Sequence, residues 1–149
     1  MNSNPAISIL MPVKNTALFL IECLESIIRQ TETDFELIAI DDDSSDESHS
    51  ILKEFAIKDK RIKVFKNTGT GIIEALRLAY SKSSGTYITR MDSDDVMSLT
   101  KLQVLTSNLV AFGSGHIALG KVLYFSASPL GAGFKNYELW LNSLIEKGT

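Results

Sequence analysis

Cysteine is nearly absent from the sequence, because Cys23 is the only one among 149 residues. A single cysteine allows no internal disulfide and no cysteine-ligated zinc site, so a reducing compartment is the simplest assumption. Basic residues are not in excess either, since 15 Lys and Arg stand against 18 Asp and Glu, for a formal net charge of −3. A nucleic-acid-binding domain usually has a basic face, so we do not expect a nucleic-acid partner.

Long hydrophobic runs are also missing. No stretch reaches the roughly 18 apolar residues of a membrane-spanning helix. Residues 1–5 lack the basic start and apolar run of a signal peptide. We therefore expect a cytoplasmic protein, or one peripheral to the inner face of the membrane, without a transmembrane segment. The hydrophobic share of 44% is enough for a core, and a chain of 149 residues is expected to form a single domain.

Strand-like and helix-like segments alternate along the chain. Apolar and β-branched runs predict strands at residues 7–11, 35–40, 61–65 and 86–90. Apolar residues at helical spacing predict helices near residues 16–30, 51–56, 72–79 and 99–112. Four successive β-then-α units favour an α/β fold, with a mostly parallel sheet and helices on both faces. Further on, we predict a strand over 116–125, a loop over 126–133 and a helix over 136–145.

Two helix starts carry residues that can cap them. Thr16 precedes the first helix, and Ser44 and Glu47 have the S-x-x-E spacing of a capping box before the second. Acidic residues near a helix start are stabilising in their own right, which gives Asp46 and Glu47 a structural explanation. Within the first helix, we expect Cys23 to pack in the core rather than to react.

Acidic clusters follow two of the predicted strands. Asp41 and Asp42 end the second strand, and Met91-Asp92-Ser93-Asp94-Asp95 follows the fourth. In open α/β sheets, ligands bind outside the carboxyl ends of the strands. Clustered carboxylates repel one another unless a hard cation such as Mg²⁺ or Mn²⁺ lies among them, and Mg²⁺ typically takes one or two carboxylates together with substrate phosphates. The structural alternative is a solvated acidic loop, or a cap for the helix that starts near Leu99.

Other phosphate-binding patterns are incomplete. The turn over residues 67–71 lacks the full G-x-G-x-x-G and does not follow the first strand, so it is not a dinucleotide fingerprint, and there is no Walker lysine. A metal-dependent phosphohydrolase would need a nucleophilic aspartate after the first strand, where Pro12-Val13-Lys14 stands. Arg77, on the third helix, is either a surface arginine or an anion-binding residue.

These segments, taken in order, resemble the nucleotide-binding half of a family 2 glycosyltransferase with the Rossmann-like GT-A fold. Residues 7–15 resemble the family's first strand and loop, and residues 24–27 and 30–31 resemble its first helix and exit. Residues 34–44 resemble the strand that ends in D-D-x-S, and residues 91–95 resemble the D-x-D motif. Asn67, Gly71, Ala75-Leu76 and residues 85–88 match the segment in between. The resemblance covers about residues 6 to 125.

The resemblance implies an inverting, metal-dependent transferase. It would move a sugar from a nucleotide-sugar donor, most commonly a UDP-sugar, to a hydroxyl of a carbohydrate or lipid-linked acceptor, in polysaccharide, cell-wall or glycoconjugate synthesis. Asp94 would be the main ligand of Mn²⁺ or Mg²⁺, and Asp92 would assist the metal or hold the ribose. Asp41, with Asp42 as the second candidate, would accept a hydrogen bond from uracil. The remaining implied nucleotide-site residues are Pro12, Val13, Asn15, Gly71, Arg77 and Ser93.

Two departures from the family pattern stand out. Arg77 stands where many relatives carry asparagine. The family's catalytic base, an acidic residue in a later motif, has no counterpart, because Glu138 and Glu146 are isolated late carboxylates. We therefore expect a single donor-binding domain over residues 1–149, truncated before a base that lies beyond Thr149. Such a chain would bind nucleotide without efficient transfer. The alternative is a non-catalytic nucleotide-sugar-binding module of the same fold.

Overall fold

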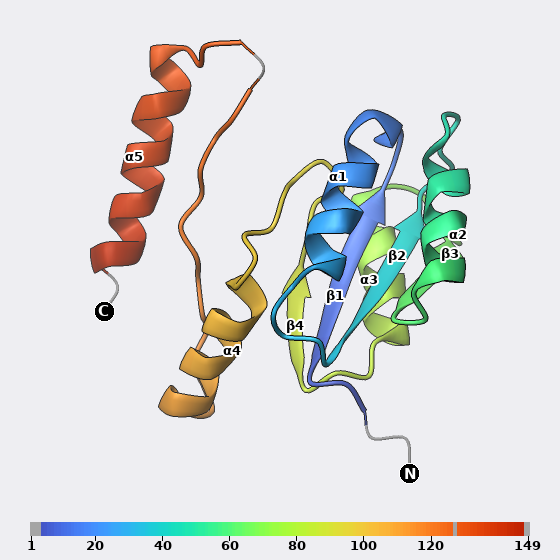
Figure 1. The fold of residues 1–149 in the computed structure, drawn as a ribbon, viewed down its shortest axis with the longest axis horizontal. Helices are drawn as coiled ribbons and strands as arrows, with labels where there is room; N and C mark the ends of the chain where they lie inside the picture. The colour runs from blue at the N-terminus through green and yellow to red at the C-terminus, as the bar shows by residue number, and fades with distance from the viewer. Residues whose placement is uncertain (1–3, 127, 148–149) are drawn as a thin grey trace. The chain divides into compact units, whose positions relative to one another are not determined.

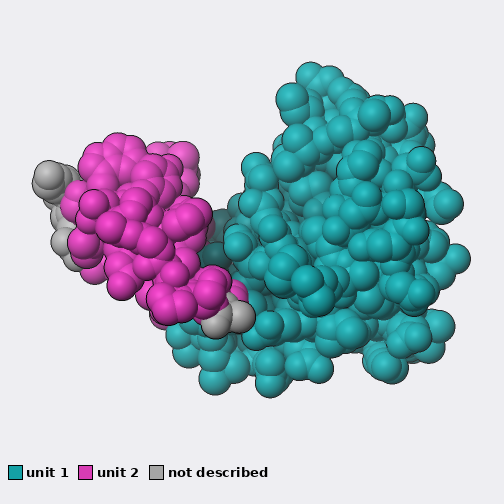
Figure 2. Space-filling view, turned by 90° about the horizontal axis from the view of Figure 1, so that it is seen from above, with its two compact units in different colours: residues 1–103 teal, residues 104–149 magenta. Residues whose placement is uncertain are grey.

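In the computed structural model, which describes residues 4–126 and 128–147, the chain forms two compact units. They comprise residues 1–103 and 104–149 (Figure 2). None of the described helices is both long and apolar enough to cross a membrane.

The first unit is built on a parallel sheet of four strands in the order β3-β2-β1-β4 (Figure 1). The strands are β1 (Ile7–Val13), β2 (Phe35–Asp41), β3 (Ile62–Lys66) and β4 (Tyr87–Arg90). Strand β1 lies between β2 and β4, and its residue Ile9 pairs with Leu37 of β2 and with Thr89 of β4. The four predicted strands and the parallel sheet are confirmed. Because all strands run the same way, their carboxyl ends meet at one edge.

Helices cover both faces of this sheet, as predicted (Figure 1). The helices α1 (Ala17–Ile28) and α2 (Ser48–Lys58) lie on one face, and α3 (Ile72–Lys82) lies on the other. Successive side chains of a strand point to opposite faces. The buried residues Ile9 and Met11 therefore join the core with α1 and α2, whereas Leu10 packs against α3. Each fully buried aliphatic side chain stabilises the folded state by roughly 1.5–3 kcal/mol relative to an exposed one. Cys23 is fully buried in the first of these cores, as expected.

A buried carboxylate connects all four strands. Glu36 of β2 is only 3% exposed. Its Oε1 accepts hydrogen bonds from Ser8 Oγ of β1 at 2.6 Å and from the backbone N–H of Ser84, just before β4, at 2.6 Å. Its Oε2 pairs with Lys63 Nζ of β3 at 2.6 Å. Gly85 lets the chain approach closely here, because a Cβ at that position would lie 2.6 Å from the backbone nitrogen of Ser8.

The helix starts differ from the predicted caps. Thr16 stands at the N-cap of α1, but its side chain makes no capping hydrogen bond. Instead, Ser48 Oγ accepts from the Thr16 N–H at 2.9 Å, and Asp46 Oδ2 accepts from the Ala17 N–H at 3.0 Å. The first turn of α1 is therefore satisfied by residues around the start of α2.

The predicted capping box is also wrong. Helix α2 begins at Ser48, with Glu47 at its N-cap and no side-chain cap. Ser44 Oγ accepts a hydrogen bond from the Asn15 N–H at 3.1 Å. Ser44 therefore binds the loop after β1, and the start of α2 is met instead by Asp46, whose Oδ1 accepts from the Ser48 N–H at 2.9 Å.

The second unit contains most of α4 (Lys101–Phe112) and all of α5 (Ala132–Lys147). The predicted helices there are confirmed, but the strand expected over residues 116–125 is wrong, because that segment is irregular. Its backbone runs along α5 (Figure 1) and bonds to side chains of that helix. Asn142 both accepts from the N–H of Val122, at 2.9 Å, and donates to its carbonyl, at 2.8 Å. These side chains satisfy backbone groups that a neighbouring strand would otherwise have paired.

Candidate functional site

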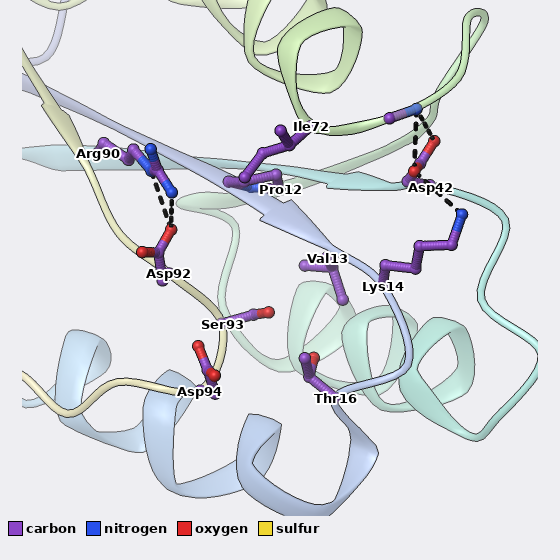
Figure 3. A pocket seen from close by; sticks show the side chains of 11 residues that line it. Pro12, Val13, Lys14, Thr16, Asp42, Ile72, Arg90, Asp92, Ser93 and Asp94 are labelled. Atoms are coloured by element: carbon purple, nitrogen blue, oxygen red, sulfur yellow. Dashed lines mark hydrogen bonds and ion pairs between the residues drawn. The ribbon is translucent and has the colours of Figure 1, made fainter.

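A cleft of about 400 Å³ opens at the carboxyl edge of the sheet (Figure 3). Its walls come from the ends of β1 and β4, the residue after β2 and the start of α3. The lining residues are Pro12, Val13, Lys14, Thr16, Asp42, Gly71, Ile72, Arg90, Asp92, Ser93 and Asp94. The cleft thus collects charged groups from three loops that are distant in the sequence.

Asp42 ties two of these loops together. Its Oδ1 accepts from Asn67 Nδ2 at 2.6 Å. Figure 3 shows two further contacts, in which Oδ1 accepts from the Gly71 N–H at 3.1 Å and Oδ2 lies 3.3 Å from Lys14 Nζ. The hydrogen bond from Asn67, followed by those from Gly71 and Lys14, outweighs burial and lowers the pKa of this carboxyl. Gly71 has a φ of 87°, a conformation that favours glycine. Asp42 is therefore an ionised anchor at the floor of the cleft.

Asp41 points the other way. Its Oδ1 accepts from the Ser44 N–H at 3.1 Å, and its Oδ2 lies 3.1 Å from His49 Nδ1 of α2. That second pair is close enough for an ion pair, but its alignment does not make a hydrogen bond. Because neighbouring strand residues face opposite sides, Asp41 faces α2 while Asp42 faces α3, and Asp41 does not line the cleft.

The loop after β4 brings its acidic residues to the opposite wall. Arg90 Nε and Nη2 both donate to Asp92 Oδ1, at 2.9 and 2.6 Å (Figure 3). Ser93 is buried, whereas Asp94 is exposed and its side chain makes no hydrogen bond or ion pair with the described residues. No group of three or more His, Cys, Asp or Glu side chains converges as a metal site within the described part of the chain.

Cys23 lies directly behind this loop. Its Sγ is 3.6 Å from the carbonyl oxygen of Asp92. Burial, and then the negative charges of Asp95, Asp94 and Asp92, raise the pKa of the thiol to about 12. A thiol with that pKa stays protonated and unreactive at neutral pH. Partial burial, followed by the negative charges of Asp94 and Asp92, raises the pKa of the Asp95 carboxyl.

Seven of the predicted site residues therefore share one cleft, and three do not line it. Asn15 has a φ of 53°, and its Oδ1 accepts from the Ser45 N–H at 2.8 Å, which fixes the loop beside the cleft. Arg77 is 73% exposed on α3 and pairs with Glu74 at 2.8 Å. Asp41 is the third.

Four lining residues escaped the sequence prediction. They are Lys14, Thr16, Ile72 and Arg90. The sequence could have indicated two of them, because Lys14 directly follows the predicted site residues Pro12 and Val13, and Arg90 stands two residues before the predicted site residue Asp92. Ile72 offered none, since its helical spacing suggested burial, yet its side chain is 49% exposed at the start of α3.

Comparison with known sequences places the chain among sugar transferases. A sequence model described as Glycosyl transferase family 2 matches residues 8–141. The chain is 38% identical over 101 residues to glycosyltransferase GlyG of Streptococcus pneumoniae serotype 4, an alignment that covers 66% of this chain and 33% of GlyG. The chain thus spans about a third of the length of this relative.

Solved structures share the fold of the chain. One is S. aureus TarS 1-349 in complex with UDP, with a TM-score of 0.66 and 21% identity over 77% of this chain and 38% of TarS. Another is the mannosyltransferase PcManGT of Pyrobaculum calidifontis in complex with GDP-Man and Mn²⁺, also with a TM-score of 0.66 and 21% identity, over 72% of this chain and 33% of PcManGT.

Proposed function

The chain belongs to glycosyltransferase family 2 and has a GT-A fold, and on that premise we propose that its cleft binds the diphosphate of a nucleotide-sugar donor. The sugar would pass, with inversion, to a hydroxyl of a carbohydrate or lipid-linked acceptor, in polysaccharide or glycoconjugate synthesis. Structures of TarS with UDP and with UDP-GlcNAc support a uridine nucleotide as the donor's carrier. The observation that carries the proposal is the cleft itself, which is lined by the carboxylates of Asp42, Asp92 and Asp94 and by two cationic side chains, those of Lys14 and Arg90.

The donor set in the cleft fits a divalent cation. Mg²⁺ typically takes one or two protein carboxylates and completes its coordination with waters and substrate phosphates, so three converging carboxylates are not required. Asp94 would be the main ligand, because it has no partner among the described residues, and Asp92 would be the second. A bound Mn²⁺ or Mg²⁺ would stabilise the charge of the leaving diphosphate as a Lewis acid.

The remaining cleft residues would position the nucleotide. We assign the uracil contact to Asp42 rather than Asp41, because only Asp42 lines the cleft. An ionised carboxylate accepts a ring N–H without donating a competing hydrogen. Lys14 is the most exposed of the present partners of Asp42, with its side chain 54% accessible, so it would be the partner that gives way to the base. Pro12, Val13 and Ile72 provide the apolar surface beside it.

A thermal-shift panel tests the proposal. UDP, CDP and GDP are compared with and without Mn²⁺, on the wild-type chain and on Asp94→Ala. A ligand at about 100 times its Kd adds about 2.7 kcal/mol to the free energy of unfolding. At about 2–4 °C per kcal/mol, this should raise the Tm by about 5–11 °C. We expect that shift with UDP and Mn²⁺, and its loss in Asp94→Ala while the fold is retained. The absence of any nucleotide shift in a folded sample would contradict the proposal.

The non-catalytic binding module is the second candidate. Its specific support is Glu138, which accepts the Tyr124 N–H at 2.6 Å and is thereby engaged in structure rather than free as a base. The side chain of Glu146 lies outside the described residues. We expect residues 1–149 to bind nucleotide without efficient acceptor-dependent turnover, since positioned acid–base catalysis typically contributes about 10²–10⁴-fold. Robust transfer by this chain would exclude the binding-only reading.

A further inference from the structure

Arg90 lies at the wall of the cleft, against one of the two carboxylates that we assign to the metal. It ends β4, and its guanidinium donates through two nitrogens to a single oxygen of Asp92, at 2.9 and 2.6 Å (Figure 3). Both side chains are about half exposed, 51% for Arg90 and 44% for Asp92. The pair is therefore formed at the wall of the cleft, in contact with solvent, and can open without disturbing the core.

This pair weakens Asp92 as a metal ligand. A guanidinium on one carboxylate oxygen neutralises the group and repels a second cation that approaches the other oxygen. In the unliganded chain, only Asp94 then remains as an unpaired carboxylate of the cleft, because Asp42 is held by Asn67, Gly71 and Lys14. A hard divalent cation alone should consequently bind weakly.

A diphosphate changes the preference of Arg90. The planar guanidinium fits phosphate oxygens as well as carboxylate oxygens, and a nucleoside diphosphate brings more negative charge into the cleft than Asp92 alone. Resting on the proposed function, we propose that Arg90 couples nucleotide and metal binding. Arg90 blocks Asp92 in the unliganded chain and turns to the diphosphate when nucleotide binds, which frees Asp92 for the cation.

The coupling has a distinctive signature. Two ligands of one protein change each other's affinity by the same factor, typically about 5–150-fold. Removing the Arg90 charge should act with opposite signs on the two ligands. In Arg90→Gln, Mn²⁺ alone should bind about tenfold more tightly, and UDP alone about tenfold more weakly, within that typical range. The factor by which UDP strengthens Mn²⁺ binding should fall. A merely structural role would weaken both ligands together.

The test measures binding rather than turnover. Free Mn²⁺ is followed by its electron paramagnetic resonance signal, with and without UDP, and UDP alone is titrated by calorimetry. Arg29→Gln is the matched control, because Arg29 pairs with Glu25 on the exposed side of α1 at 3.6 Å, outside the cleft, and should leave every constant unchanged. Arg90→Lys keeps the charge without the planar fork, and should lie between wild type and Arg90→Gln in all three constants.

The outcomes separate the inference from the proposed function. If Arg90→Gln binds Mn²⁺ no more tightly than wild type, or binds UDP as well as wild type does, the coupling role is overturned, while wild-type binding of UDP with Mn²⁺ would still support the donor site. If Arg90→Gln does not fold, Arg90→Lys decides by the same comparison. If the folded wild-type chain binds no nucleoside diphosphate at all, the proposed function fails, and the inference fails with it.

Discussion

At the scale of single residues, donors rather than exposure keep the buried carboxylates charged. Glu36 is nearly inaccessible, and burial alone would raise its pKa, yet hydrogen bonds from Lys63, Ser8 and Ser84 hold the pKa at about 2. Asp42 is lowered in the same way by Asn67, Gly71 and Lys14. Glu36 connects the strands of the sheet, and Asp42 connects the loops that form the cleft. Both therefore contribute stability only in the ionised state.

The Glu36 network predicts acid sensitivity. A carboxyl whose pKa is lowered on folding stabilises the native state above its ordinary pKa, here 4.5, and loses that contribution as the pH falls towards about 2. At about 1.4 kcal/mol per pKa unit, the loss is about 3 kcal/mol. We expect the free energy of unfolding, measured by urea denaturation, to fall steeply over this range in the wild-type chain and less steeply in Glu36→Gln.

Glu54→Gln provides the control for Glu36. Glu54 is an exposed glutamate of α2, with its side chain 70% accessible and 4.0 Å from Lys58. Its substitution should leave the pH profile as in wild type. An equally steep profile in Glu36→Gln would show that other carboxylates cause the acid sensitivity.

At the scale of elements, the regular parts were predictable and the connections were not. The strands β1 and β2 are mainly apolar, apart from Ser8 in β1 and Glu36 and the terminal Asp41 in β2, and a near-continuous apolar run is typical of a strand buried on both faces. Residues 116–125 instead alternate imperfectly between apolar and other residues, and such alternation does not show whether a neighbouring strand exists. The S-x-x-E spacing of Ser44 and Glu47 likewise shows only that a cap is possible, while the fold uses Ser48 to cap a different helix.

For the candidate site too, the location was predictable from the sequence, whereas the directions of individual side chains were not. The strand-end rule located the cleft, and seven of the predicted residues line it. The family resemblance favoured Asp41 over Asp42, whereas only Asp42 lines the cleft, because adjacent residues at a strand end face opposite sides and the outcome depends on which helix packs on each face. The sequence also could not show that Arg90 turns back onto Asp92, since that contact depends on the path of the loop.

The contact between α1 and Ser48 gives an element-scale prediction. Ser48 is fully buried, and Ser48→Ala leaves the Thr16 N–H without its acceptor, although residue 48 belongs to another helix. Loss of such a cap costs about 0.5–2 kcal/mol. Thermal unfolding should therefore show a lower Tm, by about 2–4 °C per kcal/mol. Ser50→Ala, at an exposed site on α2, is the control, and a Tm no lower than that of the control would contradict the capping role of Ser48.

At the scale of the whole molecule, the two units bury their apolar side chains very differently. Every buried hydrophobic residue of the described chain lies between Ile7 and Leu102, in the first unit. In the second unit, Ile117 is 86% and Leu123 is 77% exposed. An aromatic cluster holds its extended segment to α5, with the ring of Tyr124 6.0 Å from Phe134 and 6.3 Å from Tyr137.

This contrast predicts uneven protection from hydrogen exchange. Amides of β1 and β2 should exchange only through global unfolding, because they lie in the core of the sheet. Amides of residues 104–126 and 128–145 should exchange through much smaller local openings, since few apolar contacts oppose them. Mass-spectrometric exchange of the full chain at neutral pH measures both. Equal protection of the two units would show that the second unit is stabilised by contacts beyond those described.

The burial of Cys23 also determines how the protein can be labelled. Its thiol is inaccessible, and its pKa of about 12 leaves almost no thiolate at neutral pH. Maleimide dyes should therefore leave the wild-type chain unmodified and attach only to a cysteine introduced at the surface. A label at Thr70, which is exposed in the turn before α3 and beside Gly71 of the cleft, would report movements of that turn without first removing the native cysteine.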